Sequence, residues 1–139
     1  MRTHYAAVKA RLEASTVLAG KVYNTLAKKA DGTFITTSYV ILYGGTPDSL
    51  DDERLSSVQS IDSDAEYIYT VRSVSSTADA ALATADVAAA QLIGVVLTVS
   101  GRVCNPILLD DGGVVEMDSS LSPPLFFLDN AFLLKSSRA

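Results

Sequence analysis

Residues 65–75 alternate between two kinds of side chain, and this alternation limits the possible folds more than any other feature. Tyr67, Tyr69 and Val71 occupy every second position, and the residues between them are mostly polar or charged. Successive side chains of a β-strand point to opposite faces of its sheet, so a period of two predicts a strand with one buried face. The nearly continuous apolar run at residues 38–43 predicts a second strand, covered on both faces.

The N-terminal residues 3–16 are predicted to form a helix. Tyr5, Val8 and Leu12 recur every three to four residues, which places them on one side, and most charged residues fall off that line. Gly20 is expected to stop the segment, because glycine tolerates the positive φ that often follows a helix. A short strand over residues 21–25 should come next.

A longer helix is predicted from Thr77 to about residue 97. Ser76 and Thr77 can cap its N-terminus, and Asp79 places a negative charge in its first turn. Alanine dominates this segment, and such small side chains allow a helix to approach a sheet closely. The residues expected to face the sheet follow helical spacing: Leu82, Ala85, Ala89, Leu92 and Val96.

The remaining segments predict further strands at residues 102–109, 114–117 and 125–134. Asp111-Gly112-Gly113 is expected to turn between the first two, and Pro123-Pro124 precedes the last. Gly44-Gly45-Thr46-Pro47 should end the strand at 38–43, leaving an acidic loop at about 45–65. We therefore expect one α+β domain over residues 1–139, with two helices on one face of a mostly antiparallel sheet of about four to six strands.

Charge is distributed unevenly along the chain, although the net charge is only −5. The first thirty residues carry one acid, Glu13, against six bases: Arg2, Lys9, Arg11, Lys21, Lys28 and Lys29. Residues 48–66 hold one base, Arg54, against seven acids: Asp48, Asp51, Asp52, Glu53, Asp62, Asp64 and Glu66. Such unlike regions can dock on copies of the same chain or on a partner of complementary potential.

Side chains able to perform chemistry are scarce. His4 has no partner at metal-ligand spacing and is expected on the surface, and Cys104 lies in an apolar strand as a buried, inert thiol. The acids from Asp48 lack the spacing of a calcium loop. Residues 44–47 lack the Lys-Ser/Thr ending of a phosphate loop. We expect no cofactor, no metal and no enzymatic activity.

Membrane insertion and secretion are also not expected. Residues 80–99 are largely apolar but include Asp86, which costs about 3 kcal/mol at the bilayer centre, and alanine offsets little of that. Residues 1–12 mix charges throughout and have no apolar core of the kind found in a secretory signal.

Several segments, taken in order, resemble the tail terminator (tail-completion) proteins of long-tailed bacteriophages, particularly those of actinobacterial hosts. They are the Tyr-Val-Ile-Leu-Tyr strand at 39–43, the Val-Arg-Ser-Val strand at 71–74 and the Leu-Thr-Val-Ser-Gly-Arg segment at 97–102. The similarity spans nearly the whole chain through loose patterns, and the segment from Pro123 is less characteristic.

The resemblance implies a structural virion protein, made in the host cytoplasm and located at the head-proximal end of the tail. There it would form a ring, usually a hexamer, that ends polymerisation of the tail tube and provides the surface to which the filled head attaches. Its implied partners are further copies of itself, the tail tube protein and a head–tail connector or neck protein. DNA would pass through the lumen without specific binding.

Our hypothesis for the site is that part of the acidic segment faces the ring lumen or a stacked subunit. A negative lumen would repel the phosphates of passing DNA. The acids concerned are Asp48, Asp51, Asp52, Glu53, Asp62 and Asp64, and the complementary basic surface comprises Arg2, Lys9, Arg11, Lys21, Lys28 and Lys29. The alternatives are another connector or neck protein, a monomeric adaptor that binds a basic partner through the acidic loop, and a small metal-dependent enzyme.

Overall fold

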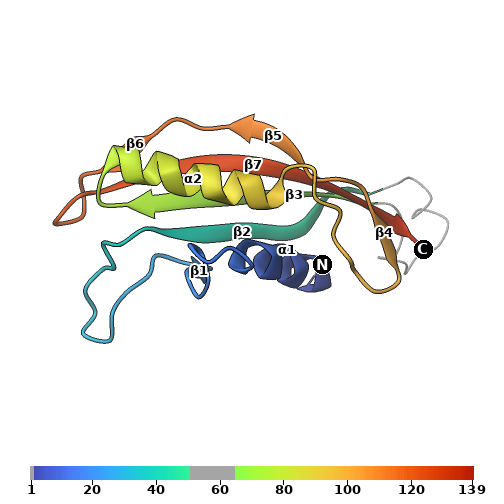
Figure 1. The fold of residues 1–139 in the computed structure, drawn as a ribbon, viewed down its shortest axis with the longest axis horizontal. Coiled ribbons are helices and arrows are strands. Elements are labelled where there is room, and N and C mark those ends of the chain that lie inside the picture. The colour runs from blue at the N-terminus through green and yellow to red at the C-terminus, as the bar shows by residue number, and fades with distance from the viewer. Residues whose placement is uncertain (1, 51–64) are drawn as a thin grey trace.

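The computed structural model describes residues 2–50 and 65–139, which form two helices and a seven-stranded sheet (Figure 1). The helices are α1 (Arg2–Glu13) and α2 (Ala78–Leu92). The strands are β1 (Val22–Tyr23), β2 (Tyr39–Leu50), β3 (Ala65–Ser75), β4 (Arg102–Cys104), β5 (Leu108–Gly112), β6 (Glu116–Asp118) and β7 (Leu125–Arg138). The α+β class is confirmed, and the strand at Ala65–Ser75 has the predicted bounds.

The sheet is almost entirely antiparallel, with β3 at its centre. β3 pairs with β2 on one side and with β7 on the other, and only the short β1 runs parallel to its neighbour, β2. The far edge of β7 pairs in turn with β4, β5 and β6, at residues 136–138, 130–133 and 125–127 of β7. These three short strands therefore act as one interrupted edge strand along β7.

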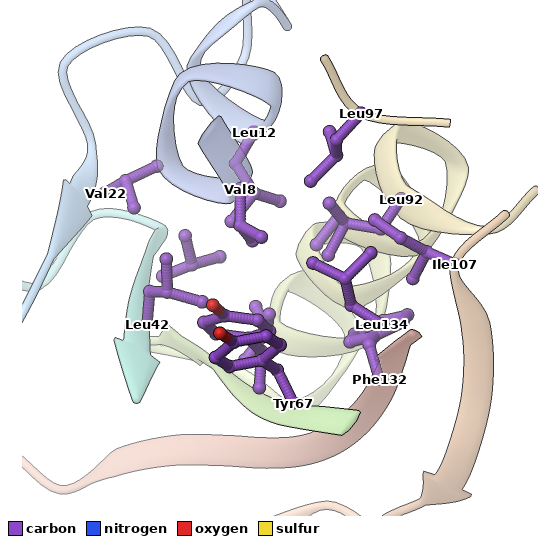
Figure 2. Close-up of a cluster of buried hydrophobic side chains, with 14 of the residues drawn as sticks. Val8, Leu12, Val22, Leu42, Tyr67, Leu92, Leu97, Ile107, Phe132 and Leu134 are labelled. Atoms are coloured by element: carbon purple, nitrogen blue, oxygen red, sulfur yellow. The ribbon is translucent and has the colours of Figure 1, made fainter. Parts of the chain in front are cut away.

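Both helices cover the same face of this sheet, and the main core lies between them and the strands (Figure 2). Val8 and Leu12 from α1 meet Leu92 from α2 above the central strands. The sheet contributes alternate residues of each long strand: Val40, Leu42, Tyr67, Tyr69, Val71, Phe132 and Leu134. The period of two read from residues 65–75 thus identifies the buried face correctly.

A second, smaller cluster lies on the opposite face. Tyr39 and Ile41 pack there with Val74, Leu125 and Ala27. Because Val40 and Leu42 belong to the first cluster, residues 39–42 are buried on both faces of the sheet, as their apolar run predicts.

Both helices end earlier than their sequence patterns predict. α1 stops at Glu13, and turns carry the chain to Gly20, which has the expected positive φ of 70°. α2 begins as predicted, with the Thr77 side chain accepting a hydrogen bond from the Ala80 amide. It ends at Leu92 because the amides of Gly94 and Ile107 bond to the carbonyls of Ile107 and Val95, which replaces the helical bonds with a tertiary pair.

The predicted sheet-facing side of α2 was partly wrong. The buried residues are Ala81, Thr84, Ala85, Ala88 and Leu92, whereas Leu82 is 47% exposed and Val96, beyond the helix end, 58%. The prediction followed the large residues, but small ones make the contact because they let the helix lie close to β3 and β7. The buried Thr84 hydroxyl donates to the Ala80 carbonyl at 2.7 Å, so it needs no partner in the sheet.

The prediction that residues 44–47 end the second strand was also wrong. β2 continues to Leu50, with shifts in its register against β3 between Gly44 and Pro47 and between Pro47 and Ser49. Gly44 has φ of 124°, and a Cβ there would lie 2.6 Å from the Ile68 carbonyl oxygen. The glycine therefore allows the strand to approach β3 through an irregularity. The loop predicted at 45–65 shrinks accordingly, and its residues 51–64 lie outside the described part of the chain.

The prediction of a hairpin turn at Asp111-Gly112-Gly113 was wrong. β5 and β6 each pair with β7 and not with each other. The Gly113 amide donates to the Asn130 side chain at 3.1 Å. A Cβ on Gly113 would collide with the carbonyl of Asp129. Close approach of two backbones explains this glycine, rather than a tight turn.

Candidate functional site

A buried polar cluster joins the start of α1 to the end of β7. His4 is 3% exposed, stacks on Tyr67 with 4.5 Å between ring centroids, and its Nε2 lies 2.9 Å from Ser136 Oγ. Arg102 Nε donates to the same hydroxyl at 2.9 Å. The prediction that His4 is a surface residue was wrong. Its spacing of four from Val8, and of eight from Leu12, was the signal that could have placed it on the buried side.

The environment of His4 keeps its ring neutral at physiological pH. Burial, aided by the positive charge of Arg102, lowers the pKa of His4 to about 4. Its Nδ1 atom has no hydrogen-bond partner in the described structure. The cluster therefore attaches the first turn of α1 to the sheet, while the neutral imidazole is enclosed in the core.

Cys104 lies 4.0 Å from the Ser136 hydroxyl and is buried and free, as the sequence predicts. Within residues 2–50 and 65–139, no group of three or more His, Cys, Asp or Glu side chains could hold a metal ion. His4 and Cys104 are thus both buried around the Ser136 hydroxyl, at the end of β7.

The predicted basic residues come from α1, from the position before β1 and from the connector between β1 and β2, and α1 and β1 lie on the β2 side of the sheet (Figure 1). Arg11 forms a hydrogen bond within the subunit: its Nε donates to the Gln91 carbonyl at 2.9 Å and so links α1 to α2. Lys9 forms an i,i+4 ion pair with Glu13 at 3.4 Å. We call the remaining set, with Lys9, the basic edge: Arg2, Lys9, Lys21, Lys28 and Lys29, all exposed except the half-buried Lys9.

The position of most of the predicted acidic residues relative to the basic edge is not described. Asp48 belongs to β2, and Asp51, Asp52, Glu53, Asp62 and Asp64 lie outside the described residues. Glu66, at the far end of that segment, pairs with Lys135 across β3 and β7 at 2.9 Å, on the sheet face away from the helices. The lumen hypothesis for the acidic segment therefore stays a prediction.

A second acidic region, which was not predicted, lies along the opposite edge of the sheet. Asp110, Asp111 and Glu116 are exposed along β5 and β6, and Asp118 is half-buried. Exposed apolar side chains lie among them: Val103 53%, Leu108 55%, Leu109 47%, Val114 72% and Met117 55%. We call this set of acidic and apolar residues the acidic edge. Its signal in the sequence was a run of four acids and no base between residues 103 and 118.

The sheet face away from the helices carries a further ion pair, between Arg72 of β3 and Asp129 of β7. Arg72 makes two bonds of 2.8 Å to the Asp129 carboxylate, and its guanidinium lies 4.4 Å from the Phe127 ring centroid. The hydrogen bond to Asp129 raises the pKa of Arg72, so this charge is permanent. The pair fixes β3 against β7.

Comparison with known proteins gives one informative result. No protein-family model matches the chain, and no curated protein matches it. A solved structure described as "Virion of native gene transfer agent (GTA) particle" contains a chain with the same fold: the TM-score is 0.67 at 19% identity, over 97% of this chain and 95% of that one. At this identity the likeness establishes the fold. None of the described helices is long and apolar enough to span a membrane.

Proposed function

We propose that this protein is a structural virion component that forms a ring at the head-proximal end of a phage-type tail. In that position it ends polymerisation of the tail tube and offers the docking surface for the head. The observation that carries the proposal is the fold shared, nearly end to end, with a chain of a gene transfer agent virion. The tail-terminator resemblance of residues 39–43, 71–74 and 97–102 supports the specific position.

The uneven distribution of charge on the subunit is compatible with ring formation. A ring closes through a heterologous contact, in which one surface of each subunit meets a different surface of its neighbour. The basic edge and the acidic edge are two such surfaces on one subunit. In the proposed hexamer one rim contacts the tail tube protein and the other a head–tail connector or neck protein. The role is assembly without catalysis, and it needs no cofactor.

Part of the acidic segment that begins at Asp48 is proposed to face the lumen or a stacked subunit. DNA then passes through the ring without binding to its wall, because the carboxylates and the DNA phosphates are both negative and repel each other at short range. The test is reversal of Asp51, Asp52 and Glu53 to Lys. We expect defective rings, abnormal tails or lost infectivity. Normal ring formation, tail length and infectivity together would remove this role from the segment.

Deletion of the gene from a particle-producing genome tests the position in the virion. Loss of a tail terminator should leave filled heads without tails and tubes of uncontrolled length, visible by electron microscopy. Light scattering after size exclusion should show the purified protein as a ring of several subunits at high concentration. A protein that stays monomeric under every condition, and is missing from mature particles, would contradict the proposal.

The second candidate is another connector or neck protein of the same kind of particle. The fold shared with a chain of a gene transfer agent virion is compatible with this position as well. The deletion separates the two candidates. Tubes of normal length that fail to join heads would indicate a neck protein, whereas overlong tubes indicate the terminator.

A further inference from the structure

We propose that the acidic edge of one copy docks on the basic edge of the next, and that this contact builds the ring. The inference rests on the proposed function and assigns the surfaces that it requires. The two edges are well placed for this, since they lie on opposite sides of one sheet: β5 and β6 flank β7, and α1 and β1 flank β2 (Figure 1). Copies translated across the sheet and rotated slightly bring one edge against the other.

The acidic edge has the features of a surface that another chain covers. Every residue of β5 is exposed, and among residues 2–50 and 65–139 no strand pairs with the outer side of β5 or β6. An open strand edge with exposed apolar side chains is an aggregation hazard unless a partner covers it. Five large exposed apolar residues are spread along it, from Val103 of β4 to Met117 of β6.

The basic edge carries matching features. It offers positive charge from Lys21, Lys28 and Lys29, and two exposed apolar side chains, Val17 at 48% and Leu26 at 36%. Among residues 2–50 and 65–139, strand pairing on the outer side of β2 is limited to β1, at Val40 and Ile41. Acid would therefore meet base, and apolar surface would meet apolar surface, across the contact.

Charge also decides which copy-to-copy contact forms. If the acidic edge met itself about a two-fold axis, Asp110, Asp111 and Glu116 would face their own equivalents, and the like charges would repel. The head-to-tail contact removes that repulsion. The occupant of the acidic edge is thus a second copy of this chain, in the orientation that generates a ring.

The test uses two double variants of the full chain. Asp110→Lys with Asp111→Lys reverses the charge of two of the four acids on the acidic edge, and Lys28→Glu with Lys29→Glu reverses two of the five bases on the basic edge. Each variant alone should raise the concentration needed for assembly at least about tenfold, measured by sedimentation velocity. An equimolar mixture should assemble near the wild-type concentration. In a ring in which the two variants alternate, the new lysines of one variant face the new glutamates of the other. Asp79→Lys with Asp86→Lys on exposed positions of α2 is the matched control and should assemble normally.

The outcomes separate this inference from the proposed function. If the wild-type protein forms rings and both double variants do so equally well, the ring uses other surfaces, and the edge assignment is wrong while the proposed function stands. If the variants lose assembly but their mixture does not regain it, complementary charge is not the basis, and the assignment is again wrong. If the wild-type protein never associates, alone or with tubes, both proposals fall. Should a double variant not fold, as judged by circular dichroism, Glu116→Lys and Lys21→Glu replace it with the same expected results.

Discussion

The helix-covered face of the sheet and its acidic edge hold similar apolar residues in opposite surroundings. Phe132 and Leu134 of β7 are at most 1% exposed beneath the helices. Leu109 pairs directly with Phe132 and Leu108 with Leu133, yet these two β5 residues are 47% and 55% exposed. Two short helices cover the central strands and leave the interrupted edge strand open. In the described part of the chain, apolar side chains therefore stay uncovered along this edge, which is the surface that the proposed assembly would bury.

Truncation of a core side chain should produce the largest effect on folding. Phe132→Ala removes a ring that is 1% exposed and is expected to lower the free energy of unfolding by about 3–5 kcal/mol. Chemical denaturation at a protein concentration below the assembly threshold measures this value. A loss under about 1 kcal/mol would show that the helix-covered face is loosely packed and would weaken the comparison with the edge.

The next effect comes from His4, at the end of the helix-covered face, and depends on pH. The unfolded imidazole takes up its proton near pH 6.5 and the folded one only near pH 4, so the unfolded state binds more protons between these values. The contribution of His4 to stability is complete above pH 6.5 and falls as the pH drops to 4, by at most about 3.4 kcal/mol at 1.36 kcal/mol per pH unit. Below pH 4 it changes no further.

The matched variant is His4→Phe, which keeps an aromatic ring against Tyr67 without a titrating group. The stability of the wild-type protein should fall more steeply than that of the variant between pH 6.5 and 4, as followed by urea denaturation at each pH. Parallel curves over this range would mean that His4 is not held neutral in the core.

A smaller effect is expected on the uncovered sheet face. Arg72→Ala removes the two-bond ion pair with Asp129 and the contact with Phe127, and should cost about 1 kcal/mol because the pair is partly screened by solvent. Thermal denaturation in low and high salt measures it, and the difference between the two proteins should narrow in high salt. An unchanged melting temperature would show that this pair does not help to hold β3 on β7.

The smallest effect on folding, and the sharpest form of the comparison, is expected at the acidic edge. Leu109→Ser should change the stability of the monomer by at most about 0.5 kcal/mol, since the side chain is half-exposed. The same change should weaken assembly, measured by light scattering. A severe loss of monomer stability would instead assign Leu109 to the core.

The parts of the fold that sequence predicted are those governed by strict periodicity. Residues 65–75 form a strand with the predicted bounds and buried face, because a period of two has one solution once one face is covered. The Thr77 cap was also predictable, since a hydroxyl at that position satisfies an amide of the first turn locally. The α+β class follows from these elements.

The predictions that were wrong concern residues whose position is determined by tertiary contacts. Gly113 was expected in a hairpin turn, but it lies against the Asp129 backbone, a contact that no local pattern predicts. Leu82 was expected in the core because of its size, whereas Ala81 and Ala88 make the close approach. The acidic edge was overlooked because no local pattern shows that Asp110 and Glu116 lie on one open edge; that follows only from the alignment of β5 and β6 along β7. The role predicted for the acids within residues 51–64, at the ring lumen or against a stacked subunit, remains a prediction.

The most direct test of the central claim is a cryo-electron microscopy structure of the assembled particle, or of rings of the purified protein. We expect a closed ring at the head-proximal end of the tube in which Asp110 and Asp111 of each subunit face Lys28 and Lys29 of its neighbour. A particle without this protein, or a ring whose β5 and β6 face open solvent, would contradict it.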